Sequence, residues 1–129
     1  MDYANSVLNE NSDNTNTSSI NLKSLGKQIS TVRKIFDCTQ VVFASAIGIT
    51  PQTLSLIERG GFKLSNNLAA KIYFSINEIM ADKDTMTLVN LEQYQIMCIQ
   101  HLMNNLRRYI AEMNSDLKTA ITEIKYNNN

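Results

Sequence analysis

The sequence predicts an all-α protein, and three features of its composition and pattern support this fold class. The 129 residues include one proline and four glycines, far fewer turn residues than a chain of many short strands needs. Apolar side chains recur at intervals of three and four residues through most of the chain, which is the spacing of one helix face. Ser, Thr or Asn precedes several of these apolar runs, as expected at helix N-termini. We therefore expect four to five short helices, followed by a long C-terminal helix or a helical hairpin.

The first 19 residues are rich in Asn, Ser, Thr and Asp and are expected to form a disordered arm. Their apolar side chains are scattered, so the segment has too little apolar surface to offset the conformational entropy lost on ordering. Its charged groups, Asp2, Glu10 and Asp13, sum to −3. The ordered part of the chain is therefore expected to start at residue 20.

The first helix is expected to begin after Asn21, whose side chain is a favourable N-cap. Ile20 and Leu25 flank this cap at the positions of a hydrophobic staple. Apolar side chains then recur three and four positions apart and give the helix one buried face. They are Leu22, Leu25, Ile29, Val32 and Phe36.

Two short helices are expected next, in the segment from Thr39 to Gly60. Thr39 caps the second helix, which ends at Gly48. Thr50 caps the third helix, and Pro51 fits its first turn because the missing N–H has no intrahelical partner there. A pair of glycines ends this helix.

A fourth helix is expected from about Ser65 to Ile76, with Leu68 and Ile72 on its buried face. Four short helices then make up the first domain, residues 20–81. Over residues 20–80 there are seven basic and three acidic side chains, a net charge of +4, although the whole chain is neutral. This excess favours a polyanionic partner, because Lys and Arg that neutralise phosphates release condensed counterions.

Residues 82–126 are expected to form a long helix or a helical hairpin that joins two copies of the chain. Between residues 85 and 125 there is no glycine or proline, and apolar side chains alternate in steps of three and four, which is a heptad pattern. The predicted dimerisation seam consists of Ile96, Ile99, Met103, Leu106, Ile110, Met113 and Leu117.

Two features of this region leave other arrangements open. Leu102, Tyr109 and Ile121 widen the apolar stripe beyond a two-stranded seam, which favours a bundle or a hairpin. The polar run at residues 114–116 is a candidate helix break. The alternative to self-association is that the stripe packs on the chain's own first domain. We favour self-association because one small domain seldom offers an exposed groove of this length.

The segment from Thr39 to Gly60 has the spacing of a helix-turn-helix. Ala44 is small enough for two helices to cross closely, and Gly48 tolerates the positive φ of a tight turn. If the apolar side chains of the third helix face the core, its remaining side chains form an outward face. Such a face is suited to reading base edges in a major groove. This face consists of Gln52, Thr53, Ser55, Leu56 and Arg59.

This segment resembles the Cro/C1 family of helix-turn-helix regulators, also called the XRE family. The resemblance covers residues 25–76 and implies a Cro/C1-like domain that binds double-stranded DNA. Arg33 stands at a family position whose arginine pairs with the glutamate matched here by Glu58, so the resemblance implies a structural ion pair between them. The residues at the family's expected offsets are Thr39, Gln40, Ala44, Gly48, Ile49, Leu54, Ile57, Glu58 and Gly60.

Carried over position by position, the resemblance also implies the roles of the DNA-facing residues. Base readout is assigned to Gln52, Ser55 and Leu56, because an amide pairs with adenine and an apolar side chain contacts the thymine methyl group. Contacts to backbone phosphates are assigned to Gln40, Thr50, Thr53, Arg59 and Lys63.

Together these features predict a sequence-specific transcriptional regulator, more specifically a repressor, that acts as a homodimer on a near-palindromic operator. One alternative is a DNA-binding platform whose C-terminal helices bind a partner protein or peptide, as in an antitoxin or a peptide-controlled switch. Another is a purely structural domain. We expect no enzyme, cofactor or metal site, because His101 is the only histidine and the two cysteines lack metal-ligand spacing. No apolar run reaches the length of a membrane span, so a cytoplasmic protein is expected.

Overall fold

The structure, a computed structural model, describes residues 20–82 and 91–127. These residues form helices and no strands, so the predicted all-α class is confirmed. The predicted N-terminal arm lies outside the described residues. The helices are α2 (Leu22–Ile35), α3 (Gln40–Ile47), α4 (Pro51–Glu58), α5 (Asn66–Ala81) and α7 (Gln93–Asn127).

α2, α3 and α4 each begin directly after the residue that the sequence predicts as the cap, and α5 begins directly after Ser65, its predicted start. The side chains of Asn21, Thr39, Thr50 and Ser65 accept hydrogen bonds from backbone N–H groups of the helix that follows. α5 continues five residues past the predicted end at residue 76. The residues of this extra stretch include no glycine or proline, and Ile79 among them packs against the core.

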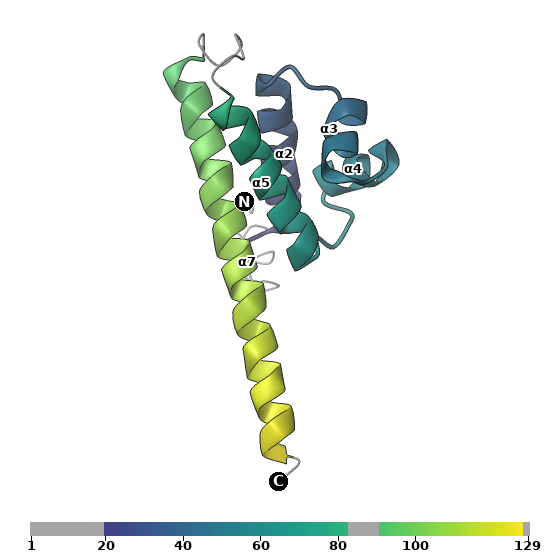
Figure 1. The fold of residues 1–129 in the computed structure, drawn as a ribbon, viewed down its shortest axis with the longest axis vertical. Coiled ribbons are helices and arrows are strands. Elements are labelled where there is room, and N and C mark those ends of the chain that lie inside the picture. Colours follow the sequence, from purple (N-terminus) through teal and green to yellow (C-terminus); the bar gives the residue numbers. More distant parts are fainter. Residues whose placement is uncertain (1–19, 83–90, 128–129) are drawn as a thin grey trace, which may run out of the picture.

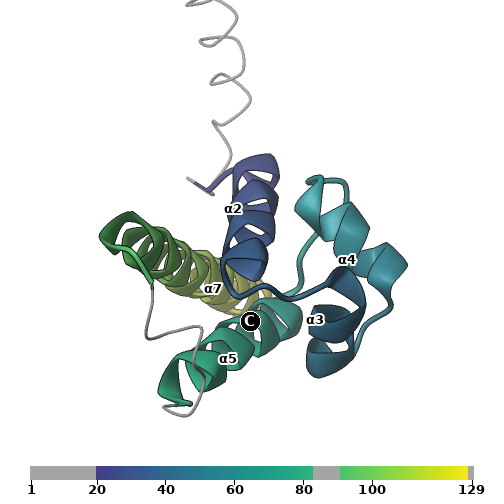
Figure 2. The same cartoon turned by 90° about the horizontal axis from the view of Figure 1, so that it is seen from above.

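α2 and α5 both pack against α7, and the α3–α4 pair lies on the far side of them from α7 (Figures 1 and 2). Contacts between helices agree with this arrangement, because α7 contacts α2 and α5, while α4 contacts α2 and α3. Two polar contacts fix the direction of α5 against α7: Asn66 bonds Asn114, and Tyr73 bonds Arg107. The two helices are therefore antiparallel.

One hydrophobic core joins the five helices that the structure describes, and α7 contributes Ile99, Leu102, Leu106 and Tyr109 to it. Ile99 and Leu106 are 1% and 0% exposed, so the prediction that they face a second chain is wrong. The heptad stripe is apolar there because it covers α2 and α5 of its own chain. The hydroxyl of Tyr109 donates to the backbone carbonyl of Leu64 at 2.6 Å, which anchors α7 to the loop between α4 and α5.

α7 is one continuous helix, so the candidate break at residues 114–116 does not occur. Met113 is the last residue of α7 that packs against the described core, and Asn114 still bonds Asn66 at the start of α5. The rest of the helix extends past the ends of α2 and α5 (Figure 1). Of the remaining predicted seam residues, four are half-buried: Ile96, Met103, Ile110 and Met113. The side chain of Leu117 lies outside the described part of the chain.

Candidate nucleic-acid interface

α3 and α4 form a sharply bent helix pair, with an angle of 102° between them. This angle lies in the range of helix-turn-helix pairs. Ala44 is fully buried at the approach of the two helices, and Gly48 ends α3 with a φ of 80°. The backbone N–H of Ile49 donates to the carbonyl of Ala44, which closes the turn. Ala44 and Gly48 therefore have the predicted roles, a small residue between two close helices and a residue with positive φ in the turn.

α4 is held against the rest of the domain by apolar packing and by one glycine of α2. Leu54 and Ile57 are 0% and 3% exposed. A Cβ atom built on Gly26 would lie 2.1 Å from the carbonyl oxygen of Ile57, so only glycine lets the two backbones approach this closely. This role of Gly26 is not among those predicted from the sequence, although a glycine inside an unbroken helical pattern is a signal of such close packing.

Arg33 and Glu58 form the predicted ion pair, which links α2 to the last residue of α4. Nε of Arg33 lies 2.7 Å from Oε2 of Glu58, and Nη2 lies 3.1 Å from Oε1. Nη1 of Arg33 also donates to the carbonyl of Cys38 at 2.8 Å. Burial raises the pKa of the Glu58 carboxyl, but hydrogen bonds from Arg33 and Gln40 and the charge of Arg33 outweigh it and leave that pKa below its ordinary value.

Gln40 belongs to this cluster as well as to the surface. Its Nε2 donates to Oε1 of Glu58 at 2.9 Å, and the side chain is half-buried. An amide nitrogen carries two hydrogens, so one remains for a ligand at the start of α3. The family resemblance implies a phosphate contact for Gln40 and does not predict its bond to Glu58.

The outward face of α4 is uncovered by the rest of the described chain. Gln52, Leu56 and Arg59 are exposed, and Ser55 is half-buried. Nη1 of Arg59 donates to Oγ of Ser55 at 2.5 Å, so the guanidinium folds back along the helix. The three residues predicted to read bases therefore share one surface with Arg59, which is predicted to contact a phosphate.

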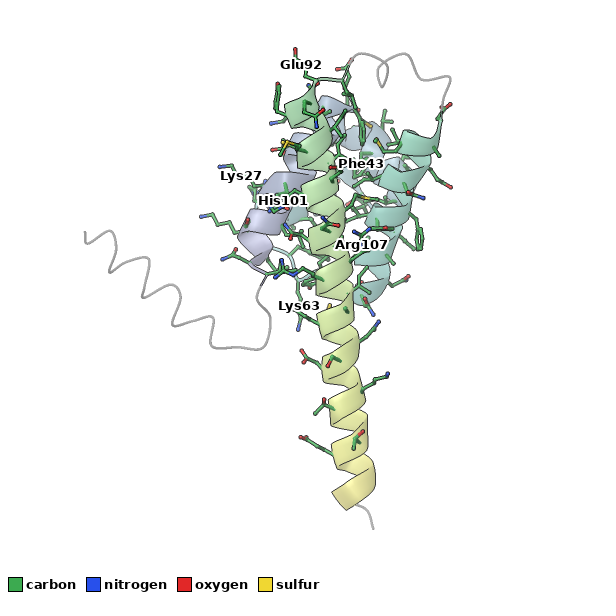
Figure 3. The ribbon with its side chains drawn as sticks, turned by 90° about the vertical axis from the view of Figure 1, so that its left-hand side faces the viewer. Lys27, Phe43, Lys63, Glu92, His101 and Arg107 are labelled. Atoms are coloured by element: carbon green, nitrogen blue, oxygen red, sulfur yellow. The ribbon has the colours of Figure 1, made fainter. Side chains whose placement is uncertain are left out.

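The other residues assigned to phosphates surround this face. Oγ of Thr50 accepts the backbone N–H of Thr53 at 3.1 Å and donates to its Oγ at 3.0 Å, so both hydroxyls sit at the N-terminus of α4. Lys63 is exposed in the loop between α4 and α5 (Figure 3). The structure thus gathers the eight predicted DNA-facing residues around the α3–α4 pair.

Searches of protein-family models, curated proteins and solved structures found no match to this chain. Among the described helices, none has both the length and the apolar character that a single membrane-spanning helix requires.

Proposed function

We propose that the chain is a sequence-specific DNA-binding regulator of transcription that inserts α4 into the major groove. The observation that carries this proposal is the uncovered polar face of α4 on a helix pair bent by 102°. A helix held at such an angle projects beyond its partner, so its N-terminal side chains can reach base edges. The net charge of +4 over residues 20–80 supports a polyanionic partner.

Gln52 is the principal base reader in this proposal. It lies in the first turn of α4 and is exposed, and its amide offers one donor and one acceptor side by side. This pair matches N7 and the 6-amino group of adenine. Leu56 follows one turn later and is 38% exposed, which leaves enough apolar surface to contact a thymine methyl group.

Backbone phosphates would be bound by groups around this face. The helix N-termini of α3 and α4 present unpaired N–H groups and a partial positive charge. The second side-chain N–H of Gln40 lies at the N-terminus of α3, and the hydroxyls of Thr50 and Thr53 lie at the N-terminus of α4. Lys63 adds a cation beyond the end of α4. These contacts would fix the position of the domain on the duplex.

A homodimer would form through the part of α7 that leaves the domain. Residues 115–127 span about 20 Å of helix at 1.5 Å per residue. A helix of this length is marginally stable by itself in water, so an apolar partner would stabilise it. Leu117, Ile121 and Ile124 continue the apolar spacing into this stretch. Two recognition helices about 34 Å apart would then read a near-palindromic site, and occupation of that site would repress a promoter.

Binding across a salt series tests the proposal. Fluorescent duplexes selected from a random pool, and scrambled duplexes of the same composition, would be titrated with the chain at several ionic strengths. We expect affinity for both to fall with salt, and selected duplexes to bind at least about 10³-fold more tightly. Equal affinity for both kinds of duplex, or binding insensitive to salt, would contradict the proposal.

The second candidate is a DNA-binding platform whose α7 binds another protein or a peptide. The stretch of α7 beyond Asn114 also favours this alternative, because an amphipathic helix can occupy a partner's groove. Sedimentation equilibrium separates the two candidates. A tight homodimer favours the regulator as proposed, and a monomer favours the platform.

A further inference from the structure

Arg59 lies on the same face of α4 as the proposed adenine reader. Gln52, Ser55 and Arg59 are spaced at i, i+3 and i+7, the spacing of residues that share one side of a helix. Arg59 caps the C-terminal end of α4, with a backbone φ of −89° and ψ of −3°. A side chain that extended straight out from this position would leave the helix near the edge of the groove.

The Arg59 side chain instead turns back along α4. Its Nη1 donates to Oγ of Ser55 at 2.5 Å, so the guanidinium lies one turn closer to the N-terminus of the helix. That end of a recognition helix is the one that meets base edges. Within residues 20–82 and 91–127 no carboxylate pairs with Arg59, so these residues leave its charge without a counter-ion.

The chemistry of the guanidinium suits one base in particular. Arginine has five N–H donors in a planar fork, and Ser55 accepts only one of them. Two others can bond O6 and N7 of guanine, which present a pair of acceptors found on no other base in the major groove. Lys63, in contrast, is an exposed point charge in the loop after α4 and has no such geometry.

We infer that Arg59 is a specificity-determining residue that reads a guanine in each half-site, with Ser55 as its positioning residue. This inference rests on the proposed function and changes the role expected for Arg59 from phosphate contact to base readout. Because the fork is already directed along the helix, less conformational freedom is lost when it meets the base.

The test uses duplexes selected with the wild-type chain, in which each guanine is replaced in turn by 7-deazaguanine, a base without the N7 acceptor. At one position in each half-site we expect this replacement to weaken wild-type binding about 5- to 150-fold. Arg59→Lys should bind the unmodified duplex more weakly than wild type by a similar factor, because lysine cannot form the two-pronged contact. Replacing the guanine by 7-deazaguanine should then weaken the binding of this variant by less than about a further twofold.

Lys63→Ala is the matched control, because it removes an exposed cation that is assigned to a phosphate. It should weaken binding to selected and random duplexes by the same factor and keep the full sensitivity to 7-deazaguanine. Ser55→Ala should lower the preference for guanine at the same position, with no change in random-duplex affinity or in Tm. An unchanged preference in Ser55→Ala would show that Ser55 does not position the arginine.

Three results would overturn the inference: selected sites without a guanine in common, wild-type affinity in Arg59→Lys, or equal losses in this variant on selected and random duplexes. The proposed function has a separate failure, which is a wild-type chain that does not distinguish selected from scrambled DNA. The two failures are therefore distinguishable.

Discussion

The guanidinium of Arg33 bonds both carboxylate oxygens of Glu58, and this bidentate pair joins the middle of the domain to the end of α4. The side chains are only 10% and 6% exposed. Two parallel hydrogen bonds fix the relative orientation of the two groups as well as their distance. The pair therefore fixes the C-terminal end of α4 against α2 and, with it, the orientation of the outward face of α4.

Arg33→Met should destabilise the domain by about 3 kcal/mol, because it leaves the Glu58 carboxylate buried without its charged partner. Lys34→Met is the control, since Lys34 is the exposed neighbour of Arg33 and its loss should change stability by less than about 0.5 kcal/mol. Urea denaturation followed by circular dichroism measures both. Equal stability of the two variants would show that the pair contributes nothing to the fold.

The stability of the domain should also depend on the ionisation of Glu58. Its pKa is lowered in the folded chain, so the unfolded chain binds the proton more readily at mildly acidic pH. The resulting stabilisation is present above the pKa of the unfolded carboxyl and is lost as the pH falls through the folded pKa. The difference in unfolding free energy between wild type and Glu58→Gln should therefore shrink on acidification. A difference that stays constant with pH would contradict the lowered pKa.

Gly26→Ala should destabilise the domain although alanine is the better helix former. The new Cβ would lie 2.1 Å from the Ile57 carbonyl oxygen, so α2 and α4 would have to separate. We expect a loss of about 1–3 kcal/mol from this overpacking. Gly61→Ala is the control, since its nearest neighbour would be 3.8 Å away and it should melt within a few degrees of wild type. Thermal unfolding of both variants decides whether the close approach exists.

Two aspartate substitutions on α7 should have different consequences. Leu106 is 0% exposed in the core, so Leu106→Asp should unfold the chain by burying a charge. Leu117→Asp should leave the fold intact and weaken the proposed dimer, with Thr119→Asp, at an exposed site, as the control. Circular dichroism and sedimentation equilibrium give the two readouts. A folded Leu106→Asp monomer would refute the core assignment, and a fully dimeric Leu117→Asp would refute the proposed interface.

The elements that the sequence predicts well are those fixed by local chemistry. Caps such as Asn21 and Thr50 act within one helical turn. Gly48 adopts the positive φ that other residues disfavour, and the fixed φ of Pro51 suits the first turn of a helix. The Arg33–Glu58 pair is a long-range contact. The family resemblance predicts it because residues at matched positions are expected to occupy the same places in the fold.

The parts that the sequence leaves undecided depend on which surfaces meet. The heptad spacing around Leu106 shows that the stripe is buried but not by which chain, and the structure assigns this part of it to α2 and α5. The partners of Gly26 and Gln40 lie more than ten positions away in the sequence. The helical pattern around Gly26 therefore signals a close approach without naming its partner, and no local pattern indicates the bond of Gln40 to Glu58. Such contacts become visible only when the helices are placed in space.

Whether α4 reads bases is decided by the affinity of Gln52→Ala for a selected duplex and for a random one. If the outward face of α4 reads bases, the variant should lose about 1–3 kcal/mol on the selected duplex and bind random DNA as wild type does. An equal loss on both duplexes, or none on either, would contradict the central claim that α4 enters the major groove.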